Sequence, residues 1–154
     1  MLGTFVRCGM HTQRWPSATS APILHRHQQS ERTTMIPIPI SVATAQQYGW
    51  GENCEGWHLV RAASLSVIEE RMAPGTCEVR HWHARARQFF YVLSGAIVLE
   101  VEGATHELSA GFGIELPSGT AHQARNEGPG DARFLVISSP PHQGDRRETE
   151  TGES

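Results

Sequence analysis

Short runs in which apolar and polar residues alternate dominate the middle of the chain and predict β-strands. The predicted strands cover residues 57–61, 64–72, 77–83, 89–93, 96–102, 104–108, 112–116, 120–125 and 133–138. Turn residues separate them roughly every 8–12 residues, which favours an all-β sandwich or barrel. No long helix is predicted, although residues 40–48 have room for one helical turn. Residues 89–93 are continuously apolar, which predicts a strand buried on both faces.

The alternation in residues 77–83 gives a first indication of function. It places Cys77, His81 and His83 on one face of a strand, with Trp82 on the other. Two histidines at i and i+2 on a strand lie about 7 Å apart at the backbone, so both rings can reach one metal ion. Cys77 is expected to pack in the core on that same face.

Two further side chains are predicted to join these histidines. Gln88 follows His83 by an odd number of residues, so the chain must turn within 84–87 for Gln88 to face inward again. His122 arrives from a distant strand after a turn containing Pro and Gly. Side chains converging from several strands of a barrel form a preorganised pocket.

Composition and charge narrow the function classes. All thirteen basic residues are Arg, so chemistry that requires a lysine amine is excluded. The net charge of −3 predicts no attraction to nucleic acid, and no apolar run approaches the roughly 18 residues needed to span a membrane. Three cysteines without paired spacing predict neither a disulfide framework nor a zinc knuckle, and favour a reducing, cytoplasmic location.

Three segments are expected along the chain. Residues 1–34 are polar and Arg-containing without an apolar period, which predicts a disordered or leader-like extension. Residues 35–140 form the predicted domain, and residues 141–154 are expected to be a flexible tail. Within the domain, the Gly- and aromatic-rich stretch 48–57 is interpreted either as a lid or swapped arm, or as an ordered loop on the barrel.

The spacing of Gly, His, Pro and Asn resembles that of a known family. The two motifs are Gly75-x5-His81-x-His83-x4-Gln88-x6-Gly95 and Gly111-x5-Pro117-x-Gly119-x2-His122-x3-Asn126. Over roughly residues 57–138 the chain is similar to the cupins, and departs from their pattern only at Gln88, where the family has Glu. The resemblance implies a single jelly roll, one divalent metal ion bound by His81, His83, Gln88 and His122, and a homodimer. The resemblance does not decide between Zn, Fe, Ni and Mn as the bound metal.

The amide at Gln88 changes the expected chemistry of such a site. Three neutral imidazoles with an amide leave a divalent site at +2, whereas a carboxylate would lower it to +1, so the ion would be a stronger Lewis acid. We therefore expect a metal-dependent cupin that polarises an oxygen of a small polar or anionic substrate, as an isomerase, lyase or dioxygenase. A non-catalytic metabolite-binding module is the alternative. The sequence identifies no catalytic base.

Several other residues have weaker expectations. Tyr91 is offset from Gln88 by an odd number of residues, so it should face away from the metal. Arg85 and Arg87 lie in the turn before Gln88, where they either steer an anionic substrate or are simply solvated, and Arg125 has the same two interpretations. Asn126 is expected to hold the turn that follows the last ligand strand.

Overall fold

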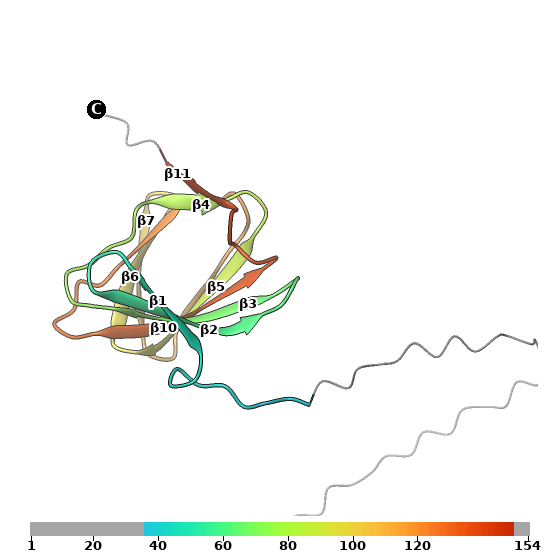
Figure 1. The fold of residues 1–154 in the computed structure, drawn as a ribbon. Helices are drawn as coiled ribbons and strands as arrows, with labels where there is room; N and C mark the ends of the chain where they lie inside the picture. Colours follow the sequence, from blue (N-terminus) through green and yellow to red (C-terminus); the bar gives the residue numbers. More distant parts are fainter. Residues whose placement is uncertain (1–35, 150–154) are drawn as a thin grey trace, which may run out of the picture. The chain divides into compact units, whose positions relative to one another are not determined.

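The computed structural model describes residues 36–149, which fold into two antiparallel β-sheets around a shared core (Figure 1). The predicted extension over 1–34 lies outside these residues. The strands are β1 (Gln46–Trp50), β2 (Cys54–Arg61), β3 (Ser66–Met72), β4 (His81–His83), β5 (Arg87–Ser94), β6 (Ala96–Val101), β7 (Ala104–Ser109), β8 (Gly113–Leu116), β9 (His122–Arg125), β10 (Ala132–Ser139) and β11 (Arg146–Glu148). The all-β prediction is confirmed.

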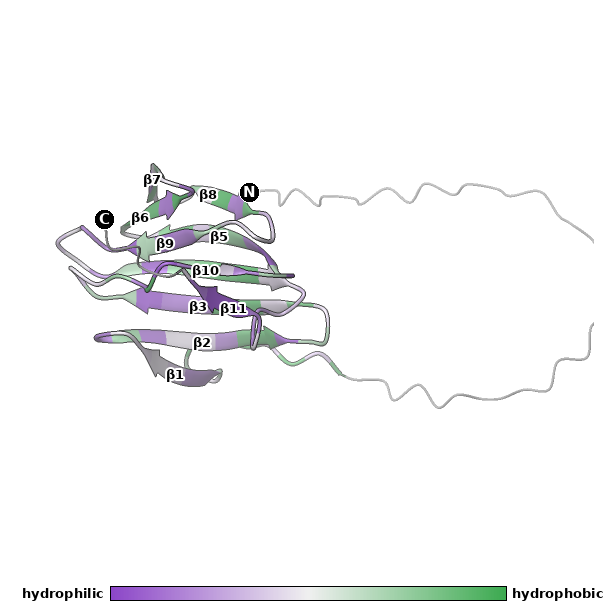
Figure 2. Cartoon of the chain, turned by 90° about the horizontal axis from the view of Figure 1, so that it is seen from above, coloured by the Kyte–Doolittle hydropathy of each residue, from purple (hydrophilic) through white to green (hydrophobic). Residues whose placement is uncertain are grey.

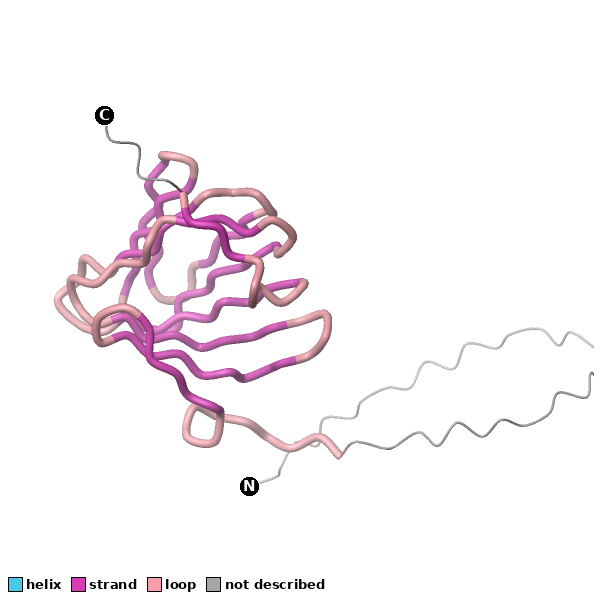
Figure 3. The backbone as a smooth tube through the Cα atoms, turned by 45° about the horizontal axis from the view of Figure 1, so that its top comes forward, coloured by secondary structure: helices cyan, strands magenta, loops and turns pink. Residues whose placement is uncertain are grey.

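The larger sheet has the strand order β1-β2-β3-β10-β5-β8, and the smaller sheet has the order β11-β4-β9-β6-β7. Only strands and loops occur in the described part of the chain (Figure 3), and none of it forms a helix able to cross a bilayer. The helical turn expected within 40–48 is a single turn in which Ala45 donates its N–H to Ser41 O at 2.8 Å, just before β1 begins. This jelly roll is the predicted architecture.

The core lies between the sheets because alternate residues of each strand point inward. Along β3, β5 and β10 the buried positions alternate with partly exposed ones, and hydrophobic and hydrophilic residues are correspondingly mixed along the strands (Figure 2). The prediction that 89–93 is buried on both faces is wrong, since Phe89 is 37% and Leu93 42% exposed. Only one face of the larger sheet is covered by the smaller sheet within this chain.

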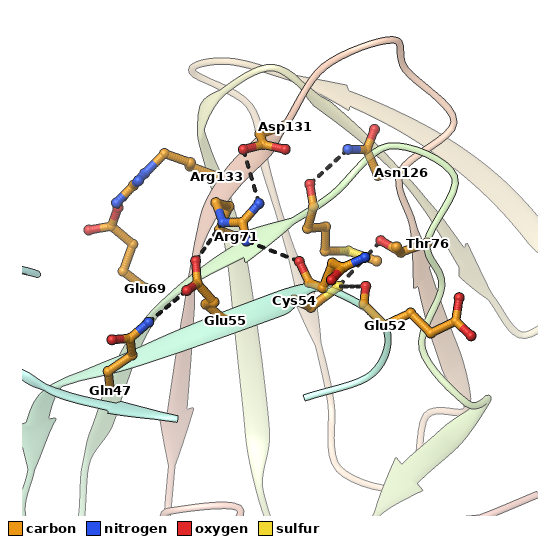
Figure 4. Close-up of polar contacts among 12 residues, drawn as sticks. Gln47, Glu52, Cys54, Glu55, Glu69, Arg71, Thr76, Asn126, Asp131 and Arg133 are labelled. Atoms are coloured by element: carbon orange, nitrogen blue, oxygen red, sulfur yellow. Dashed lines mark hydrogen bonds and ion pairs between the residues drawn. The ribbon is translucent and has the colours of Figure 1, made fainter. Parts of the chain in front are cut away.

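Tight turns and polar contacts fix the loops that connect the two sheets. Gly119 adopts a φ of +82° and donates its N–H to His83 O at 2.7 Å, which ties the second motif to the first. Asn126 donates to Met72 O and Gly130 O, both at 2.9 Å, so it holds the turn as expected. Nearby, Arg71 joins Glu55 and Asp131 through ion pairs (Figure 4).

The expected tail is wrong for residues 141–149. This segment folds back onto the barrel, and β11 pairs with β4 through Arg147↔Trp82 (Figure 1). Buried Asp145 anchors it, since its Oδ2 accepts the backbone N–H groups of Arg85 and Ala86 at 2.9 and 2.8 Å. One buried carboxylate therefore attaches a segment whose composition is that of a solvated tail. Residues 150–154 lie outside the described part.

The strand predicted for 77–83 is also shorter than expected. Only His81–His83 form β4, and Cys77 makes an isolated bridge to Arg125. Cys77 and Val79 are exposed, so the expectation that Cys77 packs in the core is wrong. The regular alternation fails between Glu78 and His81, and as a result Glu78 points into the barrel together with His81.

Candidate metal centre

Three buried histidines meet inside the barrel. His81 and His83 lie on β4, and His122 on β9 is the direct cross-strand partner of His81. Each offers one ring nitrogen, and these atoms lie within 4.8 Å of one another. That spacing is close to the separation of ligands around a single cation held ~2.1 Å from each nitrogen. The short strand β4 and its neighbour thus bring together the histidines that the sequence singled out.

Backbone carbonyl groups orient two of the three rings. The Nδ1 atoms of His81 and His122 lie 2.9 Å from Val79 O and Thr120 O, respectively. A carbonyl oxygen can only accept, so Nδ1 carries the proton in both rings and Nε2 keeps its lone pair. The Nε2 atom of His122 is buried without a hydrogen-bond partner. This is the arrangement in which an imidazole ligates a metal.

Gln88 lines the same cavity as His81 and His83. Its side chain is 4% exposed and belongs to β5, the strand that follows the turn after His83. The amide Nε2 lies 3.4 Å from Ser138 Oγ, whereas Oε1 is buried with no partner among residues 36–149. Both ring nitrogens of His83 are likewise buried without partners in this part of the chain. Buried polar atoms without partners are rare, and the three histidines lie close enough together to hold one ion.

Burial keeps the imidazoles neutral at neutral pH. Desolvation is the largest cause that lowers the pKa of His81 to about 3 and that of His83 to about 4. It also lowers the pKa of His122, against the Thr120 carbonyl, which acts in the opposite direction. Neutral imidazole is the form that binds metal, so the site keeps its nitrogens available at physiological pH.

A cavity of about 260 Å³ opens beside these residues. His81, His83 and Gln88 line one part of it. The remaining lining residues come from β1, β3, β5, β10, the segment before β4 and the C-terminal segment, and are Tyr48, Trp50, Glu70, Glu78, Phe90, Val136, His142, Gln143, Gly144 and Arg146. The stretch 48–57, interpreted as a lid or swapped arm or as an ordered loop, forms most of the β1–β2 hairpin, and its Tyr48 and Trp50 line the cavity.

Two buried carboxyl groups in the cavity were not singled out from the sequence. Glu70 is 9% exposed on the inner face of β3, and Tyr48 donates its hydroxyl to Glu70 Oε1 at 2.9 Å. Burial, followed by the charge of Glu78, raises the pKa of Glu70, and burial also raises that of Glu78. A Glu-Glu pair in 64–72 gave no indication of which carboxylate faces inward, so only the register of β3 reveals it.

The C-terminal segment contributes two further groups that the sequence prediction missed. His142 lies against His83 with ring centroids 5.5 Å apart, and its Nδ1 is 3.0 Å from Ser138 Oγ. Arg146 of β11 lines the cavity and donates to Val79 O at 3.1 Å. Since 141–154 was expected to be a tail, neither residue was a candidate.

The arginines expected at the rim of the site form ion pairs with acidic residues instead. Arg85 pairs with Asp145 at 3.5 Å, Arg87 pairs with Glu115 at 2.8 Å, and Arg125 pairs with Glu127 at 3.0 Å. None of the three lines the cavity. Tyr91 faces away from the site as predicted, and stacks on Phe89 on the outer face with ring centroids 6.2 Å apart. Arg146 is thus the arginine that faces the cavity.

Comparison with known proteins agrees with this architecture. The family described as cupin domain matches residues 68–138. The chain is 33% identical over 69 residues to the protein named polyketide synthase CurC of Streptomyces cyaneus, an alignment that covers 45% of each chain. It is 31% identical over 67 residues to protein SchB of Streptomyces halstedii, covering 44% of this chain and 49% of that one. The alignments therefore span about half the length of these relatives.

Among solved structures, the polyketide cyclase RemF of Streptomyces resistomycificus superimposes with a TM-score of 0.65. The identity is 20%, and the match covers 77% of this chain and 89% of that one. The fold and the site define a small β-barrel protein with a buried, histidine-lined cavity. Residues 68–138 match the cupin domain family, and the fold is that of cupin proteins of known structure.

Proposed function

We propose that this cupin binds one divalent metal ion through His81, His83, His122 and Gln88 and acts as a Lewis-acid catalyst on a small polar substrate. The observation that carries the proposal is the set of buried donor atoms that have no partner among the described residues, which are Gln88 Oε1, His122 Nε2 and both ring nitrogens of His83. Together with neutral imidazoles they form a nitrogen-rich donor set suited to Zn, Fe, Ni or Mn.

The substrate class we infer is a small compound with carbonyl groups on alternate carbons. One relative is named a polyketide synthase and a solved structure of the same fold is a polyketide cyclase, and polyketides are chains of such carbonyls. Aromatic and apolar side chains of Trp50, Phe90 and Val136 line the cavity and suit a carbon skeleton. Arg146 supplies a positive charge for an anionic oxygen. Isomerase- or lyase-type carbonyl chemistry is therefore favoured over oxygenation.

The steps of the proposed reaction depend on residues of this chain as well as on the metal ion. A bound metal supplies polarisation of a substrate oxygen. Gln88 is neutral and cannot accept a proton, so proton transfer requires another group of the cavity. Trp50 carries a buried indole N–H without a partner, which is available to a substrate oxygen. The apolar walls exclude water from the reacting carbon.

A non-catalytic metabolite-binding cupin remains the second candidate. It is favoured by the amide of Gln88, because a neutral oxygen donor holds a divalent ion less tightly than a carboxylate does. Ligand binding with no turnover, in the presence of each of the four metals, would support this alternative.

We further propose a cytoplasmic homodimer. Both cysteines within the described residues, Cys54 and Cys77, are free, as in a reducing compartment. Apolar side chains of Phe89, Leu135 and Ile137 lie on the outer face of the larger sheet, where Phe89 and Ile137 are direct cross-strand neighbours. A second copy covering this face would bury them.

Metal content tests the proposed function. Protein purified without chelator should contain about one metal ion per chain by elemental analysis. His81→Ala and His122→Ala should remove the ion while far-ultraviolet circular dichroism still reports a folded barrel. His106→Ala serves as the control, because His106 is exposed on β7. Wild-type protein that binds none of the four metals would contradict the proposal.

A further inference from the structure

A row of directly paired residues crosses the larger sheet and ends in the cavity. Tyr48 on β1 pairs with Gly56 on β2, Gly56 pairs with Glu70 on β3, and Glu70 pairs with Phe134 on β10. Tyr48 and Glu70 are therefore two strands apart, which is normally too far for a side-chain hydrogen bond. Their atoms nevertheless meet at 2.9 Å, from Tyr48 Oη to Glu70 Oε1.

Gly56 makes this contact possible. A Cβ atom built on Gly56 would lie 2.3 Å from Cζ and 2.5 Å from the hydroxyl oxygen of Tyr48. The phenol ring thus lies flat over the glycine, where any side chain would exclude it. The ring also stacks on His58, with centroids 5.0 Å apart. The tyrosine is held in one orientation, and its hydroxyl is directed at the carboxyl group.

The two carboxyl groups of the cavity are held differently. Glu78 Oε2 accepts the backbone N–H of Ala124 at 3.2 Å, a contact that favours its ionised form. Glu70 accepts only the Tyr48 hydroxyl among the described residues. Burial and the neighbouring charge of Glu78 raise the pKa of Glu70 to about 8. The pKa of Glu78 is raised less, to about 6, so Glu70 is the group of the two that holds a proton at pH 7.

We propose that Glu70 is the proton-transfer residue of this cavity, and that Tyr48, seated over Gly56, positions its carboxyl group toward the substrate. The inference rests on the proposed function and supplies the base that Gln88 cannot be. The Glu70 carboxylate accepts a proton from the carbon next to a substrate carbonyl, and the C–H electron pair moves into the carbonyl to form an enolate. The protonated Glu70 then returns a proton to carbon or oxygen, so the step needs no oxidant or reductant.

Infrared spectroscopy of the metal-free protein tests the carboxyl group directly. At pH 7, where Glu70 with a pKa of about 8 is protonated and Glu78 with a pKa of about 6 is ionised, the wild type should show the C=O stretching band of a protonated carboxylic acid, and Glu70→Gln should remove it. Tyr48→Phe should shift the band without abolishing it, because only the hydrogen bond is lost. Glu107→Gln, at an exposed glutamate of β7, should leave the spectrum unchanged. A band that persists in Glu70→Gln would overturn the inference.

Deuterium exchange at carbon tests the reaction. Acetoacetate, the smallest β-keto acid, is incubated in D₂O with metal-loaded protein, and its methylene signal is followed by NMR above the buffer background. Glu70→Gln should slow exchange about 100-fold and Gly56→Ala should slow it about tenfold, with metal content unchanged. Exchange at the wild-type rate in metal-loaded Glu70→Gln would overturn the inference.

The two measurements separate this inference from the proposed function. If the wild type binds no metal, the proposed function fails, and the infrared band of the metal-free protein still decides whether Glu70 carries the proton. If metal binds and Glu70→Gln exchanges at the wild-type rate, the metal centre stands and the role of Glu70 falls. If Glu70→Gln does not fold, Tyr48→Phe tests the inference instead. An unshifted infrared band in that variant would contradict the positioning role of Tyr48.

Discussion

At the scale of single residues, the amide of Gln88 determines the electrostatics of the centre. Its Oε1 is buried without a protein partner while its Nε2 faces Ser138. A carboxylate at the same position would add a negative charge among three neutral imidazoles. Because charge is poorly screened inside the barrel, this one atom changes both the affinity for a cation and the acidity of whatever the cation binds.

Gln88→Glu should therefore tighten metal binding and slow turnover. The new carboxylate attracts the cation more strongly, so we expect the dissociation constant to fall about tenfold in calorimetric titration. Ser138 can donate to the carboxylate, so the side chain keeps its neighbour. Gln143→Glu is the matched control, because Gln143 lines the same cavity on the C-terminal segment. Equal affinities in the two variants would contradict the charge argument.

The buried imidazoles make the metal-free protein acid-sensitive. Their unfolded pKa is ~6.5, whereas burial lowers the folded values to about 3 for His81 and about 4 for His83. Between these limits the unfolded state binds more protons, so the free energy of unfolding decreases as the pH falls below 6.5. Glu70 acts in the opposite direction, since its raised pKa favours the protonated folded state below about 8.

The measurement is the urea midpoint of metal-free protein between pH 7 and 4, made in a Glu70→Gln/Glu78→Gln background because burial raises the pKa of both carboxyl groups and both therefore oppose the histidines. We expect the midpoint to fall steadily through this range and to fall less steeply when His81→Gln is added. A midpoint independent of pH would show that the imidazoles ionise as freely in the folded protein as in the unfolded chain.

The sequence predicted some residues of the candidate site and did not predict others. His81 and His83 at i and i+2 indicated a shared face, and the structure brings them together with His122. Glu70 could not be found in this way, because Glu69 stands beside it and a strand that carries polar residues on both faces does not specify which one is buried. The choice is made by pairing with β2 and β10.

At the scale of elements, the segment after β10 completes the cavity. Asp145 holds it by accepting the N–H groups of Arg85 and Ala86.

Asp145→Ala should lower the melting temperature by about 5 °C and weaken metal binding, because His142 and β11 lose their anchor. Asp145→Asn keeps one acceptor oxygen, so its melting temperature should lie between those of the wild type and Asp145→Ala. Asp131→Ala, which removes an exposed partner of Arg71, is the control. A melting temperature unchanged by Asp145→Ala would contradict this role.

This element was missed for a physical reason. The three residues of β11 are all exposed and charged, so they carry no hydropathy signal, and the strand forms only because β4 offers it an open edge. Longer elements were predicted well, since β3, β6 and β10 contain enough alternating residues to fix their type. Likewise, the sequence pattern gave no sign that the strand predicted for 77–83 would begin only at His81.

At the scale of the whole molecule, the outer face of the larger sheet bears on assembly. Ile137 lies between Phe89 and Val67 in the sheet, and Tyr91 pairs with Leu135 beside them. If a second copy covers this face, Ile137→Asp should convert a dimer to a monomer in light-scattering chromatography, because it buries a charge at the interface. Thr105→Asp, on exposed β7, should leave the mass unchanged. A monomeric wild type would contradict the dimer.

The candidate ligands also come from both layers of the sandwich. Gln88 belongs to the larger sheet, while His81, His83 and His122 belong to the smaller one. A cation held by all four would cross-link two layers whose strands do not pair with one another. Its extraction should then loosen the sandwich far from the cation, and amide protons of β2 and β7, which pair with none of the ligand strands, should exchange faster once a chelator has been added.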